Sequence, residues 1–329
     1  MAPMTRTRDH GGNLDAAIAR FGGTAADWLD LSTGINPVSF PLPPLPERCW
    51  ADLPRESEMK ALCRAAQDTY GTSARVIAMN GAQGVIQLVP YLRPPGRAAV
   101  LAPTYNEHAA ALRACHWQVD EVPTCDALAG ADLAVVVNPN NPDGRRHSPE
   151  AMRRLADRVG LLIIDESFAD PDPQSAFAPH LEAHNVVVLR SFGKFYGLAG
   201  LRLGFALAQG TLADRLAEQA GPWPVSGPAI EIARHALADR TWQRQAIEML
   251  QAGAARLDAM ATCVGWQLVG GTPLFRTYAA PSAVAAQEAL AAHRVWSRIF
   301  PYSDSWIRLG LAGDEAGWAQ LAKAMETVK

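Results

Sequence analysis

Ser191-Phe-Gly-Lys-Phe-Tyr-Gly-Leu-Ala-Gly-Leu-Arg-Leu-Gly-Phe205 is the most informative stretch of this chain. It follows residues 185–190, Asn-Val-Val-Val-Leu-Arg, a β-branched run that predicts a buried strand. Its four glycines let the backbone turn tightly and approach a ligand closely: Gly193, Gly197, Gly200 and Gly204. A lysine in such a loop, directly after a buried strand, is unusual.

Lys194 shares this loop with a hydroxyl group, on Ser191, and a guanidinium group, on Arg202. A single loop lysine is more often a solvated surface residue. The three groups together favour a different interpretation, a cofactor that carries both an aldehyde and a phosphate. The amine can bond covalently to the aldehyde, while Ser191 and Arg202 hold the phosphate.

Composition excludes several classes of function. The chain has 329 residues, 49% of them hydrophobic and 19% charged, as expected of a globular protein with a large core. The net charge of −3 comes without a basic block, so neither nucleic acid nor a membrane surface is an expected partner. The five cysteines are scattered and odd in number, which argues against disulfides and a metal site and predicts a cytoplasmic protein. No signal peptide and no membrane-spanning run is expected.

Short apolar runs alternate with helical patterns through the middle of the chain. Strands are predicted at residues 76–80, 98–102, 133–137, 161–164 and 185–190. A helix is predicted over residues 56–70, and Ser148-Pro149 is a helix start signal. This alternation is typical of an α/β fold whose central sheet is mostly parallel and lies between helices.

Breaks in this pattern suggest three parts. Residues 1–46, rich in glycine and proline, are predicted to form an N-terminal arm near the active site and the small domain. Residues 47–220 would form the large cofactor-binding domain. The proline-rich segment 221–228 reads as a hinge into a smaller α+β domain, residues 221–329, which closes with a helix over residues 314–328.

Polar residues follow several of the predicted strands, where parallel sheets collect their ligands. The free amides of Gly81, Ala82 and Gln83 could hold a phosphate, although an ordinary turn would look the same. Tyr105 could stack on a pyridine ring, or it could be a packing aromatic. Asp165 could keep a pyridine nitrogen protonated, or it could cap the next element. Their common position favours the functional interpretation.

Three further candidates lie near the two ends of the chain. Arg308 has apolar neighbours, and a buried arginine calls for an anion, either an internal carboxylate or that of a substrate. His10, in His-Gly-Gly-Asn, and Asn36, in Gly-Ile-Asn-Pro, are weak signals when taken alone, because asparagine–proline pairs are common in turns.

The loop at residues 191–205 resembles the lysine loop of the fold type I pyridoxal-phosphate (PLP) enzymes, S-[FL]-[GS]-K-x-[YF]-G-L-[AP]-G-x-R-x-G. The resemblance extends over nearly the whole chain. It implies that Lys194 carries PLP, with Tyr105 on the ring, Asn141 on the ring hydroxyl group and Asp165 on the ring nitrogen. It implies a phosphate site made of the candidates already named: Ser191, Arg202 and the amides of Gly81, Ala82 and Gln83. Arg308 would hold the substrate carboxylate.

Within these enzymes the chain is similar to the threonine-phosphate decarboxylases of cobalamin biosynthesis, relatives of the histidinol-phosphate aminotransferases. Residues 10–13, 31–37 and 165–168 carry this similarity. It implies that His10 and Asn36 contact the substrate. The aminotransferases usually have a tyrosine where this chain has Phe168. Their partner-subunit tyrosine is also missing from the corresponding stretch, which leaves Tyr70 as a candidate for that contact.

The expected activity is therefore a PLP-dependent decarboxylation of L-threonine O-3-phosphate, a small phosphorylated amino acid, by a homodimer. An aminotransferase of the histidinol-phosphate type would use the same groups, because the bond held perpendicular to the ring decides which reaction occurs. A third possibility is a non-catalytic subunit of a cobalamin assembly complex. Retention of Lys194, Asp165, Asn141 and Arg202 argues against that possibility.

Overall fold

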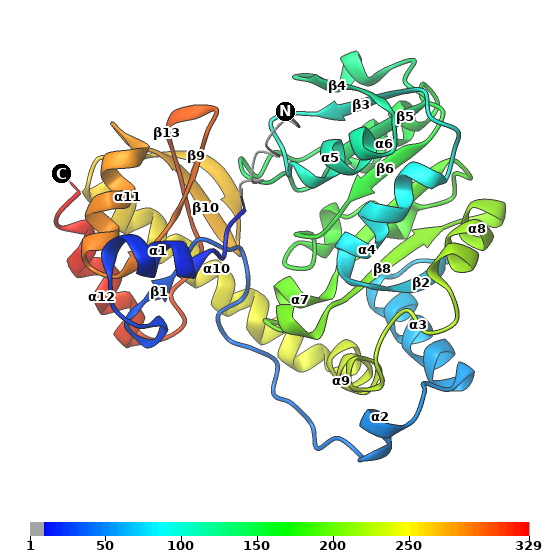
Figure 1. Ribbon diagram of the computed structural model, residues 1–329, viewed down its shortest axis with the longest axis horizontal. Coiled ribbons are helices and arrows are strands. Elements are labelled where there is room, and N and C mark those ends of the chain that lie inside the picture. Colours follow the sequence, from blue (N-terminus) through cyan, green and yellow to red (C-terminus); the bar gives the residue numbers. More distant parts are fainter. Residues whose placement is uncertain (1–9, 329) are drawn as a thin grey trace, which may run out of the picture. The chain divides into compact units, whose positions relative to one another are not determined.

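The computed structural model describes residues 10–328 and contains two compact units (Figure 1). We call residues 38–248 the core unit, and the residues up to Pro37 together with those from Met249 onward the terminal unit. These limits differ from the predicted ones at residues 46 and 220. The arm divides at Pro37 because residues 29–31 pair with residues 294–296, and the second limit falls inside a helix.

The core unit is built on a seven-stranded sheet with the order β2-β8-β7-β6-β5-β3-β4. Neighbouring strands from β7 to β4 are parallel, and β8 is antiparallel to both β2 and β7. The predicted mostly parallel sheet is thus confirmed. The strands are β2 (Arg75–Asn80), β3 (Arg97–Leu101), β4 (Gln118–Val122), β5 (Leu133–Val137), β6 (Leu162–Asp165), β7 (Val186–Ser191) and β8 (Leu203–Ala208).

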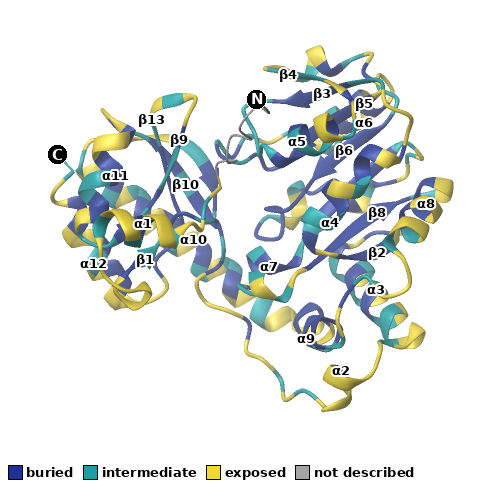
Figure 2. Ribbon diagram, in the orientation of Figure 1, coloured by how far each residue is buried: buried dark blue, intermediate teal, exposed yellow. Residues whose placement is uncertain are grey.

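Helices cover both faces of this sheet, which explains why β5, β6 and β8 are buried along their whole length (Figure 2). On one face, Val85, Leu112 and Leu216, from α4, α5 and α8, share a core with Ile163 and Leu189. On the other face, Tyr70 at the end of α3 packs edge-on against Phe205 of β8, with ring centroids 5.8 Å apart. We call these the α5 face and the α3 face.

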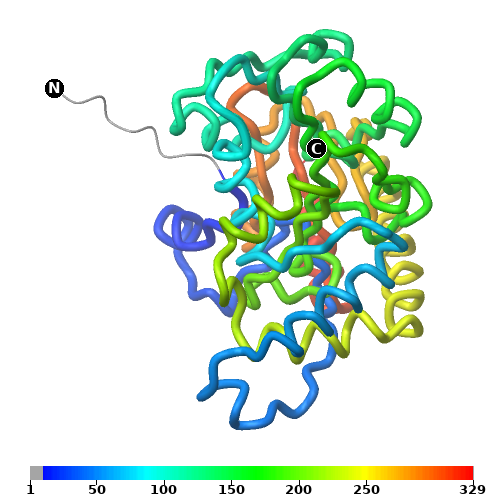
Figure 3. Tube along the Cα trace, turned by 90° about the vertical axis from the view of Figure 1, so that its right-hand side faces the viewer, coloured from blue at the N-terminus to red at the C-terminus, as the bar shows by residue number. Residues whose placement is uncertain are grey.

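Two helices of the core unit, α3 and α6, begin where the sequence predicts. The helix predicted over residues 56–70 ends at Gly71, which has a left-handed conformation with φ 60°. Ser148 and Ser226 cap α6 and α9 through their side chains. The helices are α2 (Arg48–Ala51), α3 (Glu56–Tyr70), α4 (Gly81–Leu88), α5 (Glu107–Ala114), α6 (Pro149–Ala156), α7 (Phe192–Phe195), α8 (Gly210–Ala220) and α9 (Gly227–Ala238). Figure 3 shows the irregular run before α2 as a blue loop.

Two strands of the sheet were not predicted. β4 is an edge strand in which three of the five residues are polar; Asp120 pairs with Arg97 of β3, and Glu121 pairs with Arg113 of α5. β8 (Leu203–Ala208) begins inside the glycine-rich stretch, whose glycines predict a loop, so this short apolar run was not recognised as a strand.

The terminal unit contains a four-stranded antiparallel sheet, β12-β13-β10-β9, and the parallel pair β1–β11. Phe21, Trp28 and Trp296 pack together with centroids 6.2–6.3 Å apart. The predicted closing helix is confirmed as α12. The elements are α1 (Leu14–Phe21), β1 (Leu29–Asp30), β9 (Gln267–Thr272), β10 (Phe275–Ala279), α11 (Ala283–Ala292), β11 (Val295–Trp296), β12 (Arg298–Phe300), β13 (Ser303–Leu309) and α12 (Glu315–Met325).

One long helix, α10 (Arg240–Cys263), belongs to both units, because the limit falls between Glu248 and Met249. The sequence predicts two helices or a kinked one over residues 229–261, and α9 followed by α10 confirms the first alternative. Short 3₁₀ turns cover Ala25–Asp27, Val89–Tyr91, Cys125–Leu128, Pro173–Ser175, Ala178–His180 and Ala199–Leu201.

Candidate active site

Asp165 ends β6 as a buried carboxylate. Its Oδ2 lies 2.9 Å from Nε2 of His108, and its Oδ1 accepts the amide of Ser167 at 2.9 Å. Burial raises the pKa of Asp165, but the hydrogen bond and charge of His108, the charge of Lys194 and the Ser167 hydrogen bond outweigh it and hold the pKa at about 2. Asp165 is therefore a stable anion inside the protein.

His108 was not predicted from the sequence. It lies in the first turn of α5, and its side chain is buried against Asp165. The ring of Tyr105 stands edge-on to the ring of His108, at 85° and 6.3 Å between centroids. A lone histidine in a predicted helix gives no signal by itself. The only hint was its position three residues after Tyr105.

Lys194 lies in α7, immediately after β7. Its Nζ is 4.1 Å from the centroid of the Phe168 ring, a distance at which a cation and an aromatic face attract. Its charge also contributes to the lowered pKa of Asp165, so the amine and the carboxylate influence one another electrostatically. The loop is packed tightly, because a Cβ at Gly193 would lie 2.6 Å from Cα of Ala199.

The predicted phosphate residues meet at the start of α4. Gly81 has φ +71°, and a Cβ there would lie 2.9 Å from Nη2 of Arg202. A Cβ at Gly204 would lie 2.6 Å from the carbonyl carbon of Gly81, so β8 and α4 approach too closely to leave room for a side chain there. Ser191 is the register partner of Gly204. The N-terminus of α4, the guanidinium of Arg202 and the backbone of Ser191 therefore adjoin, an arrangement that suits an anion site.

Further polar contacts lie between the predicted phosphate residues, which we call the cradle, and the helix α5 that carries His108. Tyr105 contacts Gln83 through its hydroxyl group at 3.4 Å, and Gln83 donates to Glu107 at 3.0 Å. Asn141 lies in the turn after β5, whose last residue, Val137, pairs with Asp165. All the predicted cofactor residues thus come from the core unit.

The predicted substrate residues belong to the terminal unit. Arg308 is buried on β13 and donates from Nη2 to the carbonyl of Ser32 at 2.6 Å. A Cβ at Gly11 would lie 3.4 Å from the same Nη2, so the segment that begins with the exposed His10 reaches Arg308. Asn36 is buried. His10 and Arg308 therefore come from adjoining segments of this unit, and Asn36 follows Ser32 in the chain.

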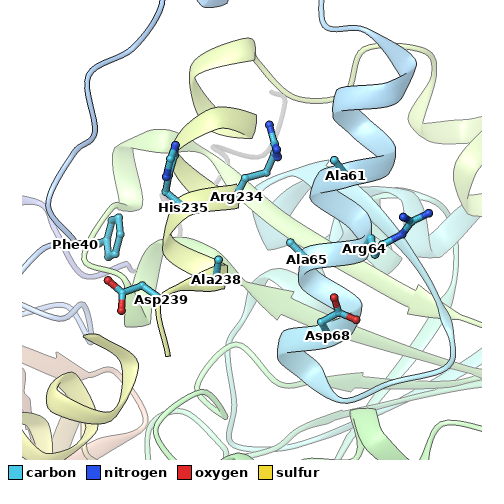
Figure 4. A pocket seen from close by; sticks show the side chains of 9 residues that line it. All are labelled: Phe40, Ala61, Arg64, Ala65, Asp68, Arg234, His235, Ala238 and Asp239. Atoms are coloured by element: carbon cyan, nitrogen blue, oxygen red, sulfur yellow. The ribbon is translucent and has the colours of Figure 1, made fainter. Parts of the chain in front are cut away.

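A separate hollow of about 800 Å³ opens between α3 and α9 (Figure 4). Small side chains form part of its wall, with basic and acidic groups around them: Phe40, Ala61, Arg64, Ala65, Asp68, Arg234, His235, Ala238 and Asp239. None of the predicted site residues is among them. This hollow is on the α3 side of the sheet, whereas Asp165 contacts α5.

The arrangement as a whole can hold a flat phosphorylated ring over a buried anion, beside an amine. Among residues 10–328, no group of three or more histidine, cysteine or acidic side chains could hold a metal ion. Within the same range, every helix is too short or too polar to cross a membrane.

Comparison with known sequences agrees with this geometry. The family described as aminotransferase class I and II matches residues 56–325. A threonine-phosphate decarboxylase of Sinorhizobium sp is 44% identical over 324 residues, which covers 96% of this chain and 97% of the relative.

Solved structures share the fold at lower identity. A histidinol-phosphate aminotransferase from Sinorhizobium meliloti, solved in complex with pyridoxal-5'-phosphate, superimposes with a TM-score of 0.83 at 19% identity, over 100% of this chain and 99% of that one. An L-threonine-O-3-phosphate decarboxylase from Porphyromonas gingivalis gives a TM-score of 0.75 at 20% identity, over 90% of this chain and 98% of that one.

Proposed function

Because this chain belongs to the class I and II aminotransferase family, we propose that it is a PLP-dependent decarboxylase of L-threonine O-3-phosphate. The products are (R)-1-aminopropan-2-ol phosphate and CO2. The observation that carries the proposal is the 44% identity to a threonine-phosphate decarboxylase over nearly the full length of both chains. The geometry supports the proposal through Asp165, a buried anion whose pKa is lowered in part by the charge of Lys194.

The residues of the core unit fit PLP. Lys194 would bond to its aldehyde, and the cradle of Gly81, Ala82, Gln83, Ser191 and Arg202 would hold its phosphate. Asp165 would face the ring nitrogen, Tyr105 the ring and Asn141 the ring hydroxyl group. When bound, PLP supplies a conjugated ring that accepts the electron pair released at the substrate Cα.

The side chains of the protein have separate tasks in this reaction. Asp165 stays ionised at every physiological pH, so it would stabilise the positive charge of a protonated ring nitrogen that faces it. Arg308, His10 and Asn36 bind the substrate and set the rotation about its Cα–N bond. When the bond between Cα and the carboxyl carbon breaks, CO2 leaves and its bonding electron pair stays with Cα. Lys194, once the amino group of the substrate has replaced it on the aldehyde, would be free as an amine to deliver a proton to Cα.

Transamination of a phosphorylated substrate such as histidinol phosphate is the second candidate. It would use the same core residues, and a histidinol-phosphate aminotransferase shares the fold of this chain. The two reactions differ in which bond at Cα breaks. A non-catalytic role in a cobalamin assembly is the third candidate and would leave the site without turnover.

The same proposal includes the setting of the enzyme. We place it in cobalamin biosynthesis and, because its five cysteines are free, in the cytoplasm. Large apolar side chains are exposed along residues 42–53 of the core unit, as at a subunit interface: Leu42, Trp50 and Leu53. A homodimer is therefore expected, and light scattering after size-exclusion chromatography measures it.

One set of assays separates the candidates. Protein incubated with PLP should show an absorption band in the visible range, and borohydride should remove this band. The reduction makes the bond between PLP and Lys194 permanent, and mass spectrometry detects it as an increase in mass. In a separate sample without borohydride, threonine phosphate alone should release CO2. Product that forms only after 2-oxoglutarate is added would establish the aminotransferase, and a colourless protein would favour the non-catalytic role.

Two variants assign the reaction to the site. Lys194→Ala should abolish both the trapped mass and the CO2 release. Lys60→Ala is the matched control, because Lys60 is an exposed helix residue paired with Glu56. Equal loss in both variants would contradict the assignment.

A further inference from the structure

Three charged side chains form a buried cluster in the core unit: Glu166, Asp170 and Arg190. Arg190 donates from Nη1 to Glu166 at 3.0 Å and from Nη2 to Asp170 at 2.9 Å. The three side chains are 0–6% exposed. We call them the ion cluster. No sequence motif pointed to it.

The ion cluster lies directly behind the candidate active site. Glu166 follows Asp165, and Arg190 precedes Ser191. Successive residues of a strand point to opposite faces of a sheet. Asp165 points to the α5 face, where His108 is, whereas Arg190 points to the α3 face, with its guanidinium carbon 4.3 Å from the Tyr70 ring centroid.

Backbone hydrogen bonds join the cluster to the strand ends and to the following loop. The amide of Glu166 donates to the carbonyl of Leu189 at 2.9 Å, which ties the end of β6 to β7. The carboxylate of Glu166 accepts the amides of Phe177 and Ala178. Residues 165–178 are therefore fixed to β7, and this segment includes Phe168, the ring beside Lys194.

The cluster also lies close to the lysine loop. Burial raises the pKa of Tyr196, and the charges of Tyr70 and Asp170 raise it further, so the cluster acts electrostatically on this side chain. Tyr196 stacks on Phe192 of α7, with centroids 4.3 Å apart. The helix that carries Lys194 thus rests on an aromatic side chain that adjoins the cluster.

Stability alone is a weak reason for such a cluster. Buried charges lose hydration, and apolar side chains of similar size often stabilise a fold equally well. The fork of an arginine, by contrast, fixes two carboxylates in a defined geometry. Here both carboxylates lie on the segment that begins at Asp165, and the arginine lies on the strand that leads to Lys194.

We propose that Glu166, Asp170 and Arg190 are positioning residues, which set how the amine of Lys194 and the carboxylate of Asp165 face one another. The proposal rests on the proposed function as far as Lys194 binds PLP, and it holds for either reaction. Tyr70, which the sequence suggested for a contact across subunits, is instead buried against this cluster, so that prediction is wrong.

The test compares Arg190→Lys, which keeps the charge and loses the fork, with Arg97→Lys. Arg97 pairs with Asp120 on the same sheet, but both side chains are partly exposed and far along the strand order from β7. Asp170→Asn is a second, milder variant for the case that Arg190→Lys does not fold. It removes the charge of Asp170 but keeps a hydrogen-bond acceptor for Arg190. Circular dichroism checks folding.

Three measurements distinguish positioning from a purely structural role. They are the fraction of Lys194 that borohydride traps with PLP, the pH at which the visible band changes, and kcat and KM for threonine phosphate. A misplacement of about 1 Å lowers kcat about 100-fold. We expect a loss of that size in Arg190→Lys and a smaller one in Asp170→Asn. KM should stay within a factor of about three, since substrate contacts come from elsewhere.

The pH midpoint of the visible band should move in both cluster variants and stay in place in Arg97→Lys. The inference is overturned if the cluster variants fold and match Arg97→Lys in pH midpoint, trapped fraction and kcat. In that case a lower melting temperature would be their only difference, and the cluster would be purely structural. A wild-type protein that traps PLP but transaminates refutes the proposed reaction and leaves this inference standing. A wild-type protein that traps no PLP refutes both.

Discussion

His108→Ala should expose how strongly the buried carboxylate of Asp165 depends on its partner. In the folded protein the two side chains meet at 2.9 Å, each almost completely buried. Removing the imidazole leaves a buried carboxylate without that hydrogen bond or charge. Burial, the largest influence on this group, then acts with less opposition, and the pKa of Asp165 rises.

The magnitude follows from the pKa. A fall from the usual 3.8 to about 2 corresponds to about 2 kcal/mol of stability at neutral pH. The pKa in the folded protein is the lower one, so this contribution is complete above pH 4 and is lost as the pH falls towards 2. At pH 3 about half of it remains. Burial opposes this net value, and His108 provides the largest of the favourable contributions, followed by Lys194 and Ser167.

A double-mutant cycle measures the interaction. Urea unfolding of the cofactor-free wild type, His108→Ala, Asp165→Asn and the double variant gives the coupling energy at each pH. We expect a coupling energy of about 2 kcal/mol at pH 7 and a clear decrease at pH 3. His235→Ala, an exposed histidine paired with Glu231, is the control. A coupling energy near zero at pH 7, or one that grows in acid, would refute the reasoning.

Three other changes have expected outcomes. Gly204→Ala should weaken PLP binding about tenfold in equilibrium dialysis, because its Cβ would lie 2.6 Å from a backbone carbon of α4, whereas Gly200→Ala, with open space around it, should not. Ser226→Ala removes the N-cap of α9 and should lower the free energy of unfolding by about 1 kcal/mol in urea; Ser226→Asp should restore it, and equal stability of all three would contradict the capping role. Phe168→Tyr adds a hydroxyl group beside Lys194 and should shift the visible band of the PLP-loaded protein at an unchanged melting temperature; an identical spectrum would show that this ring does not influence the cofactor.

Much of the core unit could be predicted from the sequence because its strands are buried on both faces. Runs such as Leu133–Val137 are apolar at every position, and the turn residues after them are polar and distinct. The lysine loop added a motif long enough to locate the amine, the hydroxyl group and the guanidinium together. β4 was missed because an edge strand needs no apolar face.

The rest depends on contacts between segments that are distant in sequence. His108 meets Asp165 across 57 residues, and Arg190 meets Glu166 across 24. Neither residue belongs to a local pattern, and the face of the sheet to which each points becomes visible only when the strands are in register. The division of the chain at Pro37 depended likewise on the pairing of residues 29–31 with residues 294–296.

The charges on β4 have a consequence for behaviour at high concentration. An outermost strand offers unused backbone groups to any other extended chain, and ionised side chains keep such chains apart. Asp120 and Glu121, each paired with an arginine, provide that protection here. Replacing both with valine would leave the interior unchanged and expose an apolar edge strand. The protein would then be expected to aggregate and precipitate well below its unfolding temperature.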